Sequence, residues 1–144
     1  MNKLENNLEN KKRQLIKDLE RFQYSYEKVS KLPLDATKFD NETLETWESF
    51  AARFGRASDI FLSQYLRSCI LLVDRGFQGT MRDFLNMGEK IGLIDDAEAW
   101  MGIRELRNLS AHEYTEEDLA EVFKRLLKES PRLLSIKDKI NAIK

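Results

Sequence analysis

The sequence predicts an all-α domain that folds as an antiparallel up-and-down bundle of five to six helices. Apolar residues recur at the three- and four-residue spacing of a helix through most of the chain, and no segment shows the alternation of a β-strand. Only two prolines and six glycines occur in the 144 residues, which leaves long stretches for helices. This length favours a single domain, residues 1–144, with room for a hydrophobic core.

The first expected helix ends near Leu32-Pro33, because proline cannot continue a helix and its predecessor prefers extended backbone. Its apolar stripe consists of Leu15, Leu19, Phe22, Tyr26 and Val29. The second and longest helix begins at the N-cap Asp40 and stops near Gly76. Its stripe consists of Trp47, Ala51, Phe54, Ser58, Phe61, Tyr65, Cys69 and Leu72. Because this helix becomes apolar on all sides near its end, we expect it at the centre of the bundle.

Two shorter helices are expected next. The third begins after Thr80 and ends around Gly92, since glycine is common just past the end of a helix. The fourth opens with Asp95-x-x-Glu98, a capping-box pattern in which the two side chains satisfy backbone N–H groups of the first turn. It continues into residues 104–114.

The C-terminal region predicts two further helices separated by a proline. Thr115 is the expected N-cap of the first, which runs through Leu126. Ser130-Pro131 then predicts a new start, since serine caps helices and proline suits the first helical position. The last helix carries the stripe Leu133, Ile136, Ile140 and Ile143.

Charge is distributed unevenly along a chain whose formal net charge is only -1. Residues 1–31 hold 8 Lys/Arg against 5 Asp/Glu, and residues 124–144 hold 7 against 2. From totals of 24 and 25, the middle of the chain therefore holds 9 against 18. Basic ends around an acidic centre indicate either a local phosphate-attracting surface or simply solvated helix faces.

The sequence favours a cytoplasmic protein with no membrane segment. The single cysteine, Cys69, lies in an apolar run and has no disulfide partner in the chain, which suits a reducing compartment and a place in the core. No apolar stretch approaches the length that spans a bilayer, and residues 1–6 lack the apolar region of a signal peptide.

Residues 104–114, with the sequence RELRNLSAHEY, contain the only histidine of the chain. Arg107 can bind phosphate through its planar fork, and His112 can move a proton near neutral pH, so the two can cleave a phosphodiester. On a straight helix Arg104, Asn108 and His112 share one side, whereas Arg107 lies about 140° away from His112. We therefore expect the helix to unwind near His112, or a second chain to complete the site across a symmetric homodimer.

Each motif residue also has an ordinary structural interpretation. His112 can bond a carbonyl at a helix end, and Arg107 can form an ion pair with a nearby glutamate or with another helix. Asn108 can cap a turn, and Tyr114 can be an amphipathic residue at a helix end. On this interpretation the chain is a plain helical assembly protein.

The combination Arg107-Asn108-x-x-x-His112-x-Tyr114, in an all-α domain of this length, resembles the HEPN superfamily and most closely its HepT-like toxins. The resemblance implies a homodimeric endoribonuclease that needs no metal and no cofactor, with its site in the cleft between two subunits. His112 then acts as general acid or base on the ribose 2′-hydroxyl, and Arg107 holds the scissile phosphate. Asn108 orients the site, and Arg104 is a further candidate for contact with RNA.

The resemblance also implies a partner, a minimal nucleotidyltransferase antitoxin that transfers AMP to Tyr114. A bulky anionic group there repels RNA phosphate, which gives a physical reason for neutralisation. The alternative function is a non-catalytic HEPN subunit that binds substrate for a nucleotidyltransferase. The acidic surroundings of the motif depart from what RNA binding favours: Glu105, Glu113, Glu116 and Glu117.

Overall fold

The computed structural model describes residues 2–110 and 115–142. These residues are helical with no strand, which confirms the predicted all-α class. The α-helices are α1 (Lys3–Val29), α2 (Asn41–Asp59), α3 (Leu66–Val73), α4 (Met81–Lys90), α5 (Ala97–Leu109) and α6 (Glu116–Ala142). A 3-10 turn, η1 (Ala36–Lys38), precedes α2, and a π-helical segment, η2 (Ile60–Tyr65), joins α2 to α3 without a break.

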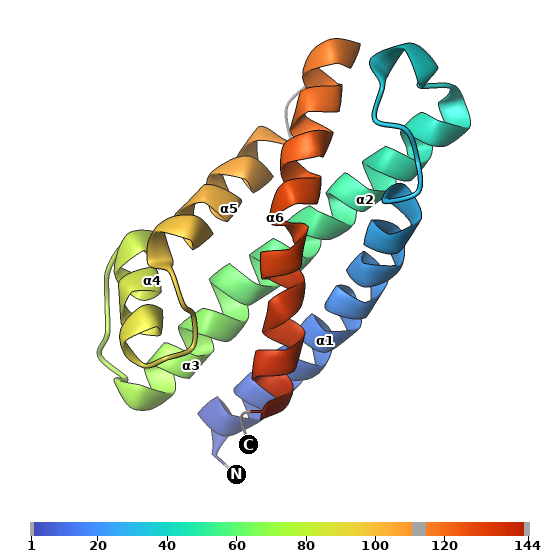
Figure 1. The fold of residues 1–144 in the computed structure, drawn as a ribbon. Helices are drawn as coiled ribbons and strands as arrows, with labels where there is room; N and C mark the ends of the chain where they lie inside the picture. Colours follow the sequence, from blue (N-terminus) through green and yellow to red (C-terminus); the bar gives the residue numbers. More distant parts are fainter. Residues whose placement is uncertain (1, 111–114, 143–144) are drawn as a thin grey trace.

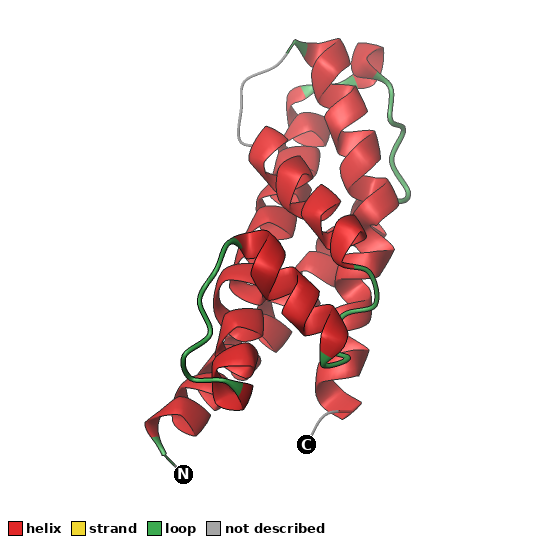
Figure 2. Cartoon of the chain, turned by 90° about the vertical axis from the view of Figure 1, so that its left-hand side faces the viewer, coloured by secondary structure: helices red, strands yellow, loops and turns green. Residues whose placement is uncertain are grey.

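The three long helical rods, α1, α2–η2–α3 and α6, lie side by side (Figure 1). The shorter helices α4 and α5 pack against each other (Figure 1). Helix α4 also packs against α3, and α5 packs against α2 and α6. Outside the helices, the described chain consists of short connections (Figure 2). With α2, η2 and α3 counted as one rod, the described chain has five rods, within the predicted range.

Side-chain caps begin the helices largely where the sequence places them. Asp40 accepts the Thr43 N–H at 2.7 Å, and this bond holds the pKa of Asp40 below its ordinary value. Thr80 and Asp83 form a capping box at α4. The cap of α5 is Asp96, one residue later than predicted, because it is Asp96 that accepts the first-turn N–H.

The long second rod departs from the prediction after Asp59. A π-helical turn holds more residues than an α-helical turn, so it rotates the side chains that follow around the axis. As a result Ile70 is fully buried, whereas Cys69 is half-buried and Leu72 is 37% exposed. The last turn of the rod is exposed at Val73, which is 67% exposed. The expectation that this helix lies at the centre of the bundle is confirmed, because the rod contacts α1, α4, α5 and α6.

The predicted break at Ser130-Pro131 is wrong, because α6 is one helix with Pro131 inside it. Ser130 does not act as an N-cap. Its buried hydroxyl instead donates to the Leu126 carbonyl, one turn back, at 2.7 Å. The apolar stripe on both sides of the proline explains the continuity, since Leu126, Leu133 and Ile136 are all buried against the same core. The N-cap Thr115 is confirmed, as its hydroxyl accepts the Asp118 N–H at 3.3 Å.

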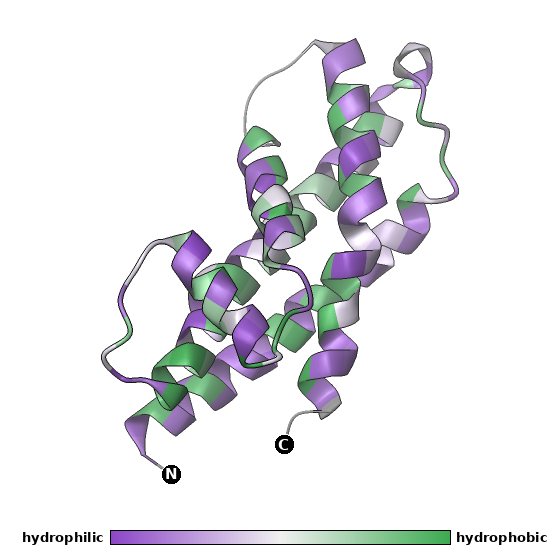
Figure 3. Ribbon diagram, turned by 60° about the vertical axis from the view of Figure 1, so that its left-hand side comes forward, coloured by the Kyte–Doolittle hydropathy of each residue, from purple (hydrophilic) through white to green (hydrophobic). Residues whose placement is uncertain are grey.

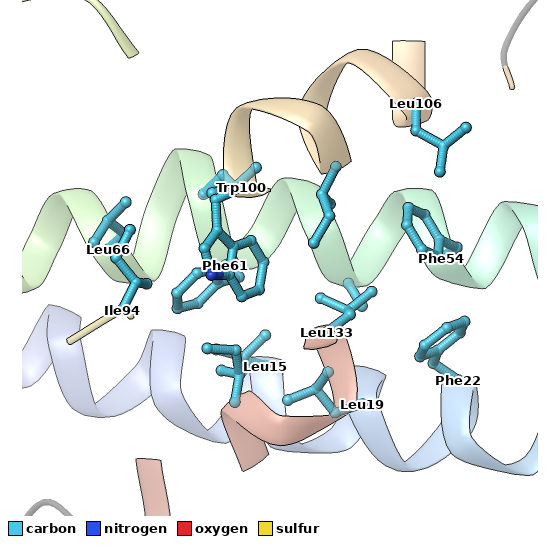
Figure 4. Close-up of a cluster of buried hydrophobic side chains, with 14 of the residues drawn as sticks. Leu15, Leu19, Phe22, Phe54, Phe61, Leu66, Ile94, Trp100, Leu106 and Leu133 are labelled. Atoms are coloured by element: carbon cyan, nitrogen blue, oxygen red, sulfur yellow. The ribbon is translucent and has the colours of Figure 1, made fainter. Parts of the chain in front are cut away.

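The core runs along the middle of the bundle and is rich in aromatic rings (Figure 4). Trp100 of α5 lies over Phe61 of η2, with 4.8 Å between ring centroids. Leucines of α1 and α6 close the cluster from the other side, including Leu15, Leu19 and Leu133 (Figure 4). Burial of these side chains supplies the main force that holds α5 against α2.

Hydrophilic and hydrophobic residues follow one another along each helix (Figure 3), as expected for helices with one buried face. In the part of the chain that the structure describes, no helix combines the length and apolar character needed to cross a membrane.

Candidate functional site

The C-terminal end of α5 carries Arg107 and Asn108. Buried Ile103 and Leu106 fix the orientation of this helix against the core, so that Arg107 lies beside α2. The helix closes at Ser110, whose N–H donates to the Leu106 carbonyl at 3.0 Å and whose hydroxyl donates to the Arg107 carbonyl at 2.8 Å. The backbone of Arg107 is thus held at a well-defined helix end.

Arg107 forms a forked ion pair with Asp59, the last residue of α2. Its Nε donates to Oδ1 at 3.2 Å and to Oδ2 at 3.1 Å, and its Nη2 donates to Oδ2 at 3.0 Å. The side chains of Arg107 and Asp59 are 31% and 52% exposed. Two parallel bonds fix the plane of the guanidinium group, which a single contact does not do.

Gly55, one turn before Asp59, makes room for this arrangement. A Cβ atom at Gly55 would lie 3.1 Å from Nε of Arg107 and 3.2 Å from its Cδ. A larger residue would push the arginine side chain away by a few tenths of an ångström, so glycine gives it this close approach to the backbone of α2. The π-helical segment then begins at Ile60, directly after Asp59. Such segments frequently occur at functional sites.

The fork with Asp59 leaves the other edge of the guanidinium group available. Within the described residues, Nη1 of Arg107 makes no hydrogen bond, and it carries two N–H donors. An anion that approaches from solvent can therefore bind Nη1 and the outer hydrogen of Nη2. The ion pair and the anion do not compete for the same donors.

The other predicted site residues are placed in part. Arg104 and Asn108 are exposed on α5, and neither forms an ion pair or a side-chain hydrogen bond within residues 2–110 and 115–142. His112 and Tyr114 lie outside the described residues. The predicted pairing of Arg107 with His112 therefore stays a prediction.

Two residues of this site could not be singled out from the sequence. Asp59 stands 48 positions before Arg107, and no motif connects the two. Gly55 gave one weak signal, because a glycine inside a helix often marks a close approach. The structural interpretation of Arg107, an ion pair with another helix, is confirmed by the Asp59 contact.

The chain has no match among protein-family models or among curated proteins. Across the described ranges, no group of three or more histidine, cysteine, aspartate or glutamate side chains could hold a metal ion. The basis for a functional assignment is therefore the chemistry of the motif and the geometry of Arg107.

Proposed function

We propose that the protein is a metal-independent endoribonuclease and the toxin of a toxin–antitoxin pair. The observation that supports this best is the presentation of Arg107, whose plane is fixed by Asp59 while its Nη1 edge stays open. Preorganised donors of this kind stabilise charge that develops in a transition state. Arg107 stands five residues before His112, the only histidine of the chain.

In the proposed reaction, His112 takes the proton of a ribose 2′-hydroxyl. The 2′-oxygen then attacks the adjacent phosphorus, and the bond from phosphorus to the 5′-oxygen breaks. The leaving 5′-oxygen receives a proton, and a cyclic phosphate remains. Arg107 binds the phosphate oxygens while their negative charge increases, and Asn108 and Arg104 contact the RNA. No step requires a metal or a cofactor.

The proposal includes an antiparallel bundle that forms a homodimer in the cytoplasm, with the cleft between the two copies. A nucleotidyltransferase antitoxin then blocks the cleft by transferring AMP to Tyr114. The added phosphate repels the RNA backbone. Mass spectrometry of the protein from a neutralised co-expression complex tests this part, and an unmodified Tyr114 there contradicts it.

One observation favours the second candidate, a non-catalytic subunit that binds substrate for a nucleotidyltransferase. The carboxylate of Asp59 lies 3.0 Å from Nη2 of Arg107 and offsets its positive charge. A neutralised arginine can still orient a phosphate through hydrogen bonds, but it stabilises developing charge less well. The two candidates differ in a single measurable property, which is cleavage.

The decisive experiment incubates the purified full chain with total RNA in the presence of EDTA. We expect cleavage to 2′,3′-cyclic phosphate ends by the wild type and a loss of at least about 100-fold in His112→Ala and Arg107→Ala. Arg132→Ala is a matched control, because Arg132 is also 31% exposed and pairs with an aspartate, Asp95, at 2.9 Å. It should cleave like the wild type. RNA that binds without being cut supports the non-catalytic subunit instead.

A further inference from the structure

A polar hollow lies between α1 and α2, which run side by side (Figure 1). It encloses about 170 Å³ and belongs to neither the motif nor the Arg107 pair. Its lining combines an aromatic ring, two cations, three hydroxyl groups and one carboxylate: Tyr24, Ser25, Lys28, Glu45, Thr46, Ser49 and Arg53.

Arg53 is held rigidly in this hollow. Its Nη1 donates to the hydroxyl of Ser25 at 2.9 Å and to the Arg21 carbonyl at 3.1 Å, and Ser25 is only 4% exposed. Its Cζ lies 5.9 Å from the centroid of the Tyr24 ring. The two bonds of Nη1 thus hold the guanidinium group against α1, while Nη2 and Nε make no hydrogen bond within the described residues.

The other lining residues match the parts of a nucleotide. Tyr24 is 63% exposed, so the face of its ring that Arg53 does not cover offers a platform on which a base can stack. Lys28 and Arg53 form no ion pair with any residue in the described ranges and can bind a phosphate. Glu45 can accept a hydrogen bond from a base amino group. A free inorganic anion would use the cations alone and leave the ring unused.

The hollow and the Arg107 pair lie on different sides of α2, because Arg53 bonds to α1 and Asp59 bonds to Arg107 of α5. Arg53, Arg56 and Asp59 follow one another at three-residue spacing, and Arg56 between them is exposed. Six helical residues correspond to about 9 Å along the axis of α2. The same six residues turn about 120° around the axis, so a single strand of RNA that contacts both places must pass around α2 over Arg56.

We propose that this hollow is a nucleotide subsite for single-stranded RNA. A base stacks on Tyr24, and its phosphate binds Lys28 and Arg53. The inference rests on the proposed function for its RNA substrate. Binding and cleavage can nevertheless be measured separately.

The test measures fluorescence anisotropy of a labelled ten-nucleotide RNA of mixed sequence, in the His112→Ala background and at several salt concentrations. We expect Tyr24→Ala to weaken binding about 10-fold with an unchanged salt dependence, because stacking is uncharged. Tyr24→Phe keeps the ring and should bind normally. Lys28→Ala should weaken binding and reduce the slope of log K against log salt by about 0.7, the value for one phosphate of a single strand.

Lys17→Ala is the matched control, because Lys17 is an exposed lysine of the same helix outside the hollow. Circular dichroism of each variant reports whether the helices persist. RNA binding by Tyr24→Ala equal to that of Lys17→Ala would overturn the subsite, as would equal competition by polyglutamate, which indicates an acidic protein segment. If the wild type does not cut RNA but these binding differences hold, the proposed ribonuclease fails and the subsite stands.

Discussion

At the scale of single residues, a substitution at Gly55, which contacts Arg107, should affect the stability of the fold and the activity in different ways. Gly55→Ala should preserve or slightly raise the free energy of unfolding, because alanine favours a helix over glycine by about 1 kcal/mol. The same Cβ atom would displace the Arg107 side chain, which lies 3.1 Å away. We therefore expect RNA cleavage to fall by about 10-fold or more, since small misplacements at a site are costly.

Gly102→Ala provides the control for this prediction. Gly102 lies in α5, close in sequence to Arg107, and a Cβ there meets nothing within 4 Å. It should raise the free energy of unfolding by about 0.5–1 kcal/mol and leave cleavage unchanged. Urea unfolding and an RNA assay on both variants check the pair. Equal cleavage by the two would show that the position of Arg107 is not critical.

Asp59 is expected to position Arg107 rather than to stabilise the fold. Its ion pair is partly exposed, so Asp59→Ala should lower the free energy of unfolding by less than about 1 kcal/mol. Cleavage should fall about 10-fold or more, because Arg107 loses its fixed plane. Asp59→Asn should recover part of the activity, since the amide oxygen still accepts from Arg107. Asp95→Ala breaks the comparable Arg132 pair and should leave cleavage intact.

At the scale of helices, local signals predicted where most elements begin. The caps at Asp40, Thr80 and Thr115 require only neighbouring residues, and the structure confirms all three. The π-helical segment after Asp59 could not be predicted in this way. One wide turn has no distinctive residue composition. Its only effect on the apolar stripe is that Ile70, rather than Cys69, becomes buried.

The predicted helix start at Ser130-Pro131 is wrong because a serine followed by a proline occurs both at helix starts and, as here, inside a helix. Inside α6 the proline ring provides no N–H for the carbonyl four residues earlier, so the helix forms despite it. Burial of Leu126 and Leu133 on either side offsets this loss. Tertiary packing therefore outweighed a local signal.

The prediction is that Pro131→Ala raises the free energy of unfolding by between about 1 and 3 kcal/mol. Pro131 is exposed, so the substitution removes no core contact and restores a backbone donor. Chemical denaturation monitored by circular dichroism measures the change. A lower stability would mean that α6 needs the proline geometry at this position.

At the scale of the whole molecule, the sequence predicted the all-α class because apolar periodicity is present in every segment. It also singled out Arg107 within a motif. The partner of that arginine could not be predicted, since Asp59 comes from a different helix and meets Arg107 only after the rods pack. Long-range pairs of this kind depend on which helices pack together, and the spacing of residues along a single helix does not predict that packing.

A homodimer makes a further prediction about how Arg107 and His112 combine. The cleft between the two copies holds two equivalent pairs of Arg107 and His112. If each pair takes Arg107 from one copy and His112 from the other, a mixed dimer of Arg107→Ala and His112→Ala has one pair intact. Equal co-expression gives about half mixed dimers, each with one intact pair of two, and thus about a quarter of wild-type cleavage.

If both residues of a pair come from the same copy, every pair in the mixed dimer lacks one of them and cleavage stays absent. Each variant expressed alone is the control and should be inactive. Light scattering establishes that the preparation is dimeric before the activities are compared. Recovery of cleavage on co-expression therefore distinguishes a site shared between two chains from one contained in a single chain, because only exchange of subunits can restore an intact pair.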